Sequence, residues 1–283
     1  MEGGCVKALL ASATRAEIDV NYICPRRCKF CYNSRLLETG ARMGMQKFTG
    51  IVGAMPNLRR ADISGGEPYC EQELPKMIAH LAGKRILCDV STGGTAWRED
   101  VADEGKRAAA QGLFAIQISV PAITESVYDS VTATKGELLN LMENVGKFAM
   151  AFGEKARIVM TLCKENMGEI GNVSGLAKKY SLPLFVVPMM RTGGCSAIPL
   201  DVQELLRVKF FIESLRHGGA RIHFSFSELG DSCPVFAKTY GLPKLEGSCM
   251  GDKAHAYIDA HGNVSGCTFL KGNGIQPEGL ACK

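Results

Sequence analysis

Three cysteines near the start of the chain form a C-x3-C-x2-C pattern, Cys24-Pro-Arg-Arg-Cys28-Lys-Phe-Cys31. Thiolate sulfurs are ligands of zinc and of iron–sulfur clusters, and three on one short loop can converge on one metal centre. Two chemistries are therefore open: zinc with a fourth ligand elsewhere, or a 4Fe-4S cluster with three protein ligands and one open iron. Zinc sites usually pair their cysteines in two C-x2-C units, whereas the next thiol, Cys70, stands alone. The spacing favours the iron–sulfur cluster.

The elements that must position this loop alternate β-rich apolar runs with helix-patterned stretches, which is typical of parallel βαβ units. Six such repeats predict an α/β barrel, or part of one, with its chemistry at the carboxyl ends of the strands. The cysteine loop follows the first strand. Strands are expected at Ile18–Ile23, Arg60–Ser64, Ile86–Ser91, Ala115–Val120, Arg157–Leu162 and Leu184–Pro188, and helices at Met43–Met55, Gln72–Leu81, Arg98–Ala110, Gly136–Phe152, Met167–Tyr180 and Asp201–His217.

The composition changes after this alternating region. Residues 226–283 are rich in Gly, Pro and Cys, which predicts a small second unit after a first domain of residues 1–225. Within it, Ala256–Ile258 and Asn263–Ser265 flank Asp-Ala-His-Gly, the pattern of a β-hairpin. A unit this small needs a metal or the main domain to order it.

The composition of the whole chain excludes several classes of protein. It has 283 residues, 46% hydrophobic and 22% charged, with a net charge of +4, so it is neither disordered nor collagen-like, and nucleic-acid binding is not expected. No apolar run is long enough to span a membrane and no export signal is evident, so we expect a cytoplasmic protein. In a reducing compartment, 12 cysteines point to metal or redox chemistry rather than to disulfides.

The cysteine loop, with an aromatic residue beside its last cysteine, resembles the signature of the radical SAM superfamily. A second motif, Gly65-Gly66-Glu67-Pro68 after the second predicted strand, is similar to the GGEP-type motif of the family. The resemblance implies a partial (β/α)6 TIM-type barrel, in agreement with the strand count. It also implies that a 4Fe-4S cluster, which binds the amino and carboxylate groups of S-adenosylmethionine at its open iron, is held by Cys24, Cys28 and Cys31.

Further residues acquire expected roles from the resemblance. The glycine pair lets backbone approach the methionine part of the cofactor, and Glu67 accepts a hydrogen bond from its ammonium, unless the motif is only a strand-to-helix turn. Other cofactor contacts are expected beside the last cysteine, at strand ends and after the sixth strand; these are Phe30, Tyr32, Ser91, Ser119 and Met189. Loop packing and helix capping are the alternative roles of these residues.

The implied reaction starts with one electron delivered to the cluster. Reductive cleavage of the sulfonium gives methionine and a 5′-deoxyadenosyl radical, which abstracts hydrogen from an unactivated carbon. Such a radical needs a site closed to water and oxygen, which a barrel interior provides. A flavodoxin- or ferredoxin-type electron donor is the implied partner.

The carboxyl-terminal cysteines resemble a second family pattern. Cys249 and Cys267 flank Gly262 in a C-x12-G-x4-C segment similar to the start of SPASM and twitch extensions, which carry auxiliary 4Fe-4S clusters. The longer cysteine run of a full SPASM domain is missing, so the shorter twitch form fits better. Cys282 and Cys233 are the further candidate ligands. A zinc knuckle or reduced thiols are the alternatives.

The resemblance supports a peptide maturase that abstracts hydrogen from a side chain or from the backbone. A cofactor or small-molecule biosynthesis enzyme is the alternative, and a non-catalytic iron–sulfur electron-transfer protein is a hypothesis of another class, which would not need Gly65-Gly66-Glu67. About 17 residues precede the first predicted strand, too few for a recognition fold. A peptide substrate is therefore expected to bind the barrel directly or through a separate leader-peptide-binding protein.

Overall fold

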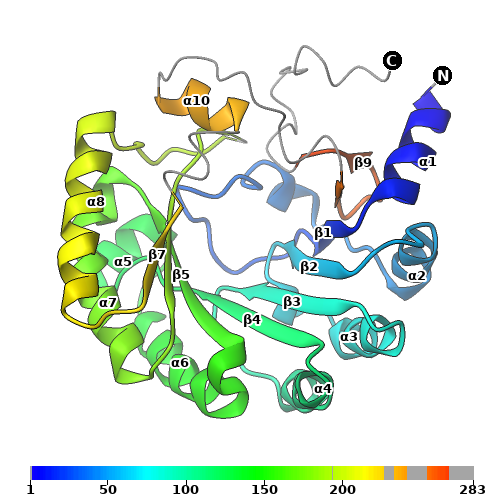
Figure 1. The fold of residues 1–283 in the computed structure, drawn as a ribbon, viewed down its shortest axis with the longest axis horizontal. Helices are drawn as coiled ribbons and strands as arrows, with labels where there is room; N and C mark the ends of the chain where they lie inside the picture. The colour runs from blue at the N-terminus through cyan, green and yellow to red at the C-terminus, as the bar shows by residue number, and fades with distance from the viewer. Residues whose placement is uncertain (1, 193, 226–232, 241–253, 268–283) are drawn as a thin grey trace.

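One curved β-sheet, covered by helices on its outer face, forms the fold (Figure 1). The computed structural model describes residues 2–192, 194–225, 233–240 and 254–267. In this part of the chain the sheet has nine strands in the order β7-β6-β5-β4-β3-β2-β1-β8-β9. The bounds are β1 Arg15–Asn21, β2 Arg60–Gly65, β3 Leu87–Thr92, β4 Phe114–Ser119, β5 Ala156–Leu162, β6 Leu184–Pro188, β7 Ile222–Phe224, β8 His255–Ile258 and β9 Val264–Ser265. Only β8 and β9 pair in antiparallel orientation among these neighbours.

The helices α2 to α8 follow strands in the chain and lie on the convex side of the sheet, whereas α1 precedes β1 and α10 lies at the top of Figure 1. The α-helices are α1 Glu2–Ser12, α2 Met45–Gly53, α3 Leu74–Gly83, α4 Glu99–Ala110, α5 Glu125–Thr132, α6 Leu138–Phe152, α7 Ile170–Lys179, α8 Val202–His217 and α10 Pro234–Tyr240. Short 3-10 turns are η1 Leu36–Thr39, η2 Pro68–Cys70, η3 Gly153–Lys155 and η4 Lys164–Glu169. No helix in the described residues is both long enough and apolar enough to cross a lipid bilayer.

Strict alternation of burial explains why the strands adopt this register. In β4, Ile116 and Ile118 point outward against the helices and are fully buried, whereas Gln117 and Ser119 face the interior and are partly exposed. The same alternation continues through β5 and β6. Burying each large aliphatic side chain contributes about 1.5–3 kcal/mol, so a shift of one residue in any strand would be strongly unfavourable.

The helix expected at Asp201–His217 shows how local sequence fixes an element. Its first residue is the N-cap: Asp201 Oδ1 accepts from the backbone N–H of Glu204 at 2.8 Å, and Glu204 Oε2 accepts from the N–H of Asp201 at 2.7 Å. This reciprocal capping box satisfies two backbone donors at the helix start. The helix itself is therefore α8, beginning at Val202.

The predicted fold class and all six predicted strands are confirmed, and the sheet is open rather than closed. The first strand begins at Arg15 rather than Ile18, because Arg15 and Glu17 are polar residues on the interior face and the sequence pattern did not include them. The helices α1, α5 and α10 and the short strand β7 were not predicted.

The carboxyl-terminal hairpin was predicted correctly and is part of the main sheet. β8 pairs with β1 in parallel, with Arg15 opposite His255 and Ile18 opposite Ile258. The hairpin therefore continues the barrel sheet beyond its first strand. Residues 226–232, 241–253 and 268–283 lie outside the described residues, so the proposed division at residue 225 stays a prediction.

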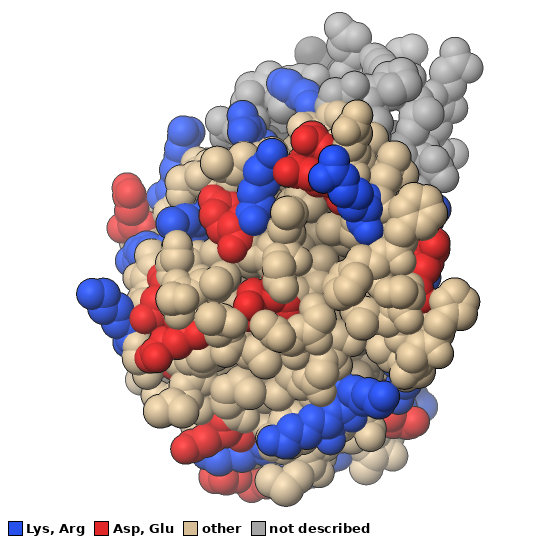
Figure 2. Space-filling view, turned by 90° about the vertical axis from the view of Figure 1, so that its left-hand side faces the viewer, with Lys and Arg blue, Asp and Glu red and all other residues tan. Residues whose placement is uncertain are grey.

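The side of the molecule that carries α8 has a mixed surface (Figure 2). Basic and acidic side chains are interspersed there with uncharged surface. Part of this uncharged surface comes from α8 itself, on which Phe210 is 68% exposed.

Candidate active site

The cysteine loop leaves the carboxyl end of β1 and is fixed from two sides. Two of its backbone amides donate to the carbonyls of Val131 and Thr132 at the end of α5, at 2.9 and 3.1 Å. On the other side, the carbonyl of Lys29 accepts from the amides of Ser196 and Ala197, in the connection between β6 and α8, at 2.8 and 3.0 Å. The loop is thus tied by backbone hydrogen bonds to α5 and to the connection between β6 and α8.

The three thiols of this loop are free and partly buried. Burial raises the pKa of Cys24 to about 12, and burial together with the neighbouring Cys28 raises the pKa of Cys31 to about 12. Burial also raises the pKa of Cys28. A bound metal centre supplies the positive charge that such thiolates need.

The geometry of the loop also bears on the kind of metal centre. Among the described residues, no three ligating side chains converge closely enough for one metal ion. A 4Fe-4S cluster binds each thiolate at a different iron, so three thiols on one loop could each bind a separate iron of a cluster.

The glycine pair at the end of β2 is packed directly against the start of the cysteine loop. Gly65 has φ of +124°, and the amides of Gly66 and Glu67 donate to the carbonyls of Asn21 and Ile23 at 2.8 and 2.7 Å. A Cβ on Gly66 would lie 2.4 Å from the Ile23 carbonyl oxygen. The absence of side chains is therefore required for the close contact between β2 and the residue before Cys24.

Glu67 is buried, and its carboxylate is held by chain donors. Oε1 accepts from the amide of Tyr69 at 3.0 Å and from the hydroxyl of Thr92 at 2.8 Å, and Oε2 accepts from the amide of Gly93 at 2.7 Å. A carboxylate offers about four acceptor sites. One of these remains for a further donor, as the expected ammonium contact requires.

Asn33, which the sequence analysis did not single out, joins the two motifs. Its side-chain amide is buried and donates to the carbonyl of Gly65 at 3.0 Å and to Asp19 Oδ2 at 3.1 Å. The hydroxyl of Tyr257 on β8 donates to the same carboxylate oxygen. The cysteine loop, β1, β2 and the hairpin therefore share one buried hydrogen-bond network.

Phe30 and Met189 come together in a small apolar cluster. Its buried members are Met189, Val131, Cys163 and Ala197, and Phe30 packs against them. The structure thus brings two of the expected cofactor contacts to the same place, on the side of the loop that faces β6.

Three other expected cofactor residues lie on the interior side of the barrel. The hydroxyl of Tyr32 donates to Glu17 Oε1 at 2.8 Å and lies 3.2 Å from Ser64 Oγ. Ser91 accepts from Gln117 Nε2, and Ser119 is partly exposed at the end of β4. Tyr32 and Ser91 are therefore engaged within the chain, and Ser119 faces the mouth.

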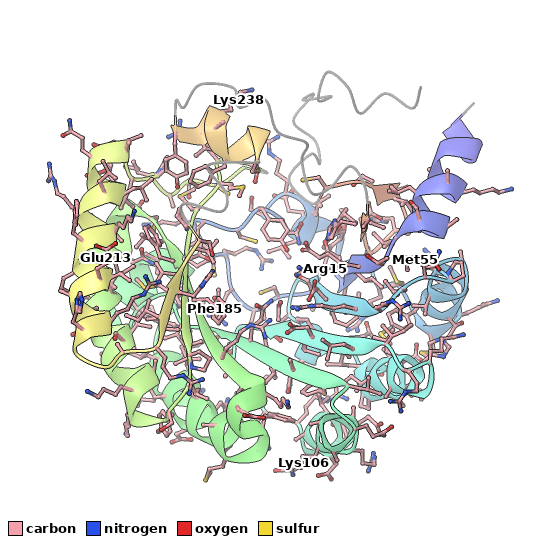
Figure 3. All side chains as sticks on the ribbon, in the orientation of Figure 1. Arg15, Met55, Lys106, Phe185, Glu213 and Lys238 are labelled. Atoms are coloured by element: carbon pink, nitrogen blue, oxygen red, sulfur yellow. The ribbon has the colours of Figure 1, made fainter. Side chains whose placement is uncertain are left out.

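A chain of ion pairs crosses the barrel interior below these residues. Arg15 and Arg60 both contact Asp62, and Arg60 also contacts Asp89, which contacts Arg157 in turn. Figure 3 labels Arg15 and Phe185, which belong to strands on opposite sides of the curved sheet. This network was not predicted from the sequence, although polar positions in β1, β2, β3 and β5 were the available signal.

Two of the four candidate ligands among the carboxyl-terminal cysteines, Cys233 and Cys267, lie within the described residues. Cys233 packs against the main core just before α10, and Cys267 follows β9, where its carbonyl accepts from Ser265 Oγ at 3.2 Å. Cys249 and Cys282 lie outside the described residues. The ligand set of an auxiliary cluster therefore stays a prediction.

Comparison with known families identifies the class to which this fold and site belong. Residues 18–176, more than half of the chain, match the family model described as the radical SAM superfamily. The chain belongs to this superfamily of enzymes, and membership implies a 4Fe-4S cluster and S-adenosylmethionine. The three loop thiols and the close-packed glycine pair fit this pair of groups.

Individual relatives are more distant. The chain is 22% identical over 260 residues to the mycofactocin maturase MftC of Mycobacterium ulcerans (strain Agy99), covering 89% of this chain and 67% of that protein. It is 26% identical over 262 residues to the PqqA peptide cyclase of Xanthomonas euvesicatoria pv. vesicatoria (strain 85-10), covering 88% and 66%. The chain thus spans about two thirds of the length of these relatives.

The fold resembles that of a solved structure from Streptococcus suis. SuiB bound to its precursor peptide SuiA superposes with a TM-score of 0.72 at 15% identity, covering 94% of this chain and 62% of SuiB. SuiB bound to S-adenosylmethionine superposes with a TM-score of 0.69 at 14% identity, covering 93% and 62%. At this level of identity the likeness concerns the fold.

Proposed function

We propose that this chain is a radical SAM peptide maturase, which abstracts hydrogen from a side chain or from the backbone of a peptide. The observation that carries the proposal is the junction of the cysteine loop with Gly65-Gly66-Glu67 at the carboxyl ends of β1 and β2. Asn33 connects the two motifs by hydrogen bonds to Gly65 and Asp19. The two motifs on which the resemblance to the radical SAM superfamily rests therefore lie at one place.

The residues of this chain have separate tasks in the proposal. Bound together, a 4Fe-4S cluster and S-adenosylmethionine supply a carbon-centred radical that takes a hydrogen atom from the substrate. The loop cysteines hold the cluster, and Glu67 receives the ammonium on its remaining acceptor site. Phe30 and Met189 offer an apolar surface for the adenine, and Ser119 faces the bound groups from β4.

The peptide substrate is supported by the names of the relatives. One is a maturase and another is a cyclase of the peptide PqqA, and SuiB has been solved with a precursor peptide. The substrate binds the barrel mouth directly or with the help of a separate leader-peptide-binding protein. A flavodoxin- or ferredoxin-type protein supplies the electron.

We also propose a twitch-like extension with an auxiliary 4Fe-4S cluster held by Cys233, Cys249, Cys267 and Cys282. The β8–β9 hairpin supports this proposal, because it lies inside the C-x12-G-x4-C segment. The free thiols of the described residues favour a reducing compartment, and we propose that the protein is cytoplasmic.

The enzymatic proposal is tested by anaerobic reconstitution with iron and sulfide, followed by dithionite and S-adenosylmethionine. We expect 5′-deoxyadenosine from the wild-type protein and none from Cys28→Ala. Equal product from both proteins, or none from a fully reconstituted wild-type protein, would contradict the proposal.

The auxiliary cluster has an independent test. A protein in which Cys24, Cys28 and Cys31 are all replaced by alanine should retain about four irons if a second cluster exists, since a 4Fe-4S cluster has its own cysteine ligands. Loss of all iron from this variant, while the wild-type protein is loaded, would refute the second cluster.

A further inference from the structure

A buried arginine lies inside the cysteine loop, between the first two cysteines. Arg26 is 3% exposed, whereas its neighbour Arg27 is exposed. A guanidinium is always charged and offers five N–H donors. Burying a guanidinium whose N–H donors have no partner is costly in free energy.

The guanidinium of Arg26 is only partly satisfied by the described residues. Nη1 donates to the hydroxyl of Tyr128 at 3.3 Å, and Nη2 is buried with no hydrogen-bond partner there. None of the ion pairs found in the described residues includes Arg26. A buried positive charge with a free donor is thus left at the proposed cofactor site.

The position of the free donor is defined by Gly93 at the end of β3. A Cβ built on Gly93 would lie 1.5 Å from Nη2 of Arg26, so the guanidinium occupies the space that a side chain would fill. The amide of the same glycine donates to Glu67 Oε2 at 2.7 Å. One residue therefore separates a buried carboxylate from a buried guanidinium.

We propose that Arg26 binds the carboxylate of the methionine part of S-adenosylmethionine. An α-amino acid carries its ammonium and its carboxylate on one carbon, and the pair Glu67 and Arg26 presents the complementary charges around Gly93. The charge-assisted hydrogen bond to the carboxylate fills the free donor at Nη2. This inference rests on the proposed function, and it makes Arg26 a cofactor-binding residue.

Anaerobic equilibrium dialysis of the reconstituted protein with S-adenosylmethionine and with decarboxylated S-adenosylmethionine tests this assignment. Arg26→Gln removes one hydrogen bond between two charged groups. The affinity for S-adenosylmethionine should therefore fall about 10- to 100-fold. The affinity for the decarboxylated analogue should change less than about threefold, because that ligand has no carboxylate to lose.

A second variant keeps the guanidinium of Arg26 but displaces it. Gly93→Ala puts a methyl group where Nη2 lies and displaces the guanidinium, so it should cause the same selective loss for the ligand that carries a carboxylate. Lys135→Gln is the matched control, because it removes an exposed positive charge three residues after α5. Its affinity for both ligands should equal that of the wild type.

The iron content of every protein is measured, so that loss of the cluster can be distinguished from loss of ligand binding. Equal losses for the two ligands, or wild-type affinity in both Arg26→Gln and Gly93→Ala, would overturn the assignment. Failure of both variants to load iron would also overturn it, because Arg26 would then support the loop rather than bind the ligand. A loaded wild-type protein that binds no S-adenosylmethionine would instead refute the proposed function.

Discussion

Asn33 gives the sharpest test of how the site is held together, because one buried amide serves both motifs. In Asn33→Ala, the carbonyl of Gly65 loses a donor at 3.0 Å and the carboxylate of Asp19 loses one at 3.1 Å. A neutral buried hydrogen bond contributes about 1 kcal/mol and one to a charged acceptor about 1.5–3 kcal/mol. The free energy of unfolding should therefore fall by about 2.5–4 kcal/mol.

Urea unfolding of the two proteins under identical iron loading measures this difference. Asn57→Ala is the matched control, since its side-chain amide donates to the carbonyl of Ala11 at 2.8 Å at an exposed position. We expect that variant to lose no more than about 0.5 kcal/mol. If Asn33→Ala and Asn57→Ala are destabilised equally, the buried amide does not join the two motifs in the way argued above.

Further outcomes follow from other parts of the structure. Gly66→Ala places a methyl group 2.4 Å from the Ile23 carbonyl oxygen and should lower the iron content after reconstitution, whereas Gly50→Ala, with open space at a helical position, should leave the iron content unchanged. Asp89→Ala leaves the guanidinium groups of Arg60 and Arg157 without the carboxylate that they share. In urea titrations the free energy of unfolding should fall by about 3–5 kcal/mol. A loss below about 1 kcal/mol, the size expected for an exposed ion pair, would contradict this. Burial, with the nearby Arg15, lowers the pKa of His255 below its usual 6.5. The unfolded chain thus binds this proton more readily, so stability should fall as pH drops below about 6.5, by at most about 1.4 kcal/mol per pH unit, and His255→Gln should flatten this slope.

Local patterns were sufficient to predict six strands, six helices, the carboxyl-terminal hairpin and the two motifs. β-rich apolar runs predicted β4, β5 and β6 with their neighbours, and in the structure each of these strands has one face buried against the helices. The helix pattern at Asp201–His217 predicted α8, whose capping box at Asp201 and Glu204 the structure shows. The cysteine loop and the glycine pair were recognisable because their spacing is set within a few residues of chain.

The features that local patterns could not predict depend on partners far away in the sequence. Asn33 is defined by Gly65 and Asp19, and the free donor of Arg26 by Gly93. Sequence spacing showed Glu67 as a ligand candidate and gave no sign of its three chain donors. The charged side chains of the barrel interior are only isolated polar positions in the sequence. Which of them form ion pairs depends on the register between strands, which the sequence does not give.

The pairing of β8 with β1 has a consequence for how the site is assembled during folding. Thr14 and Ala254, which hydrogen-bond beside this pairing, are 240 residues apart in the chain. Contacts between such distant residues form late, because closing a long loop costs conformational entropy. Until His255–Ile258 is synthesised, the strand that carries the cysteine loop keeps an open edge, where strands of other chains can pair. The late-synthesised strand β8 therefore protects β1, the strand on which the cluster loop depends.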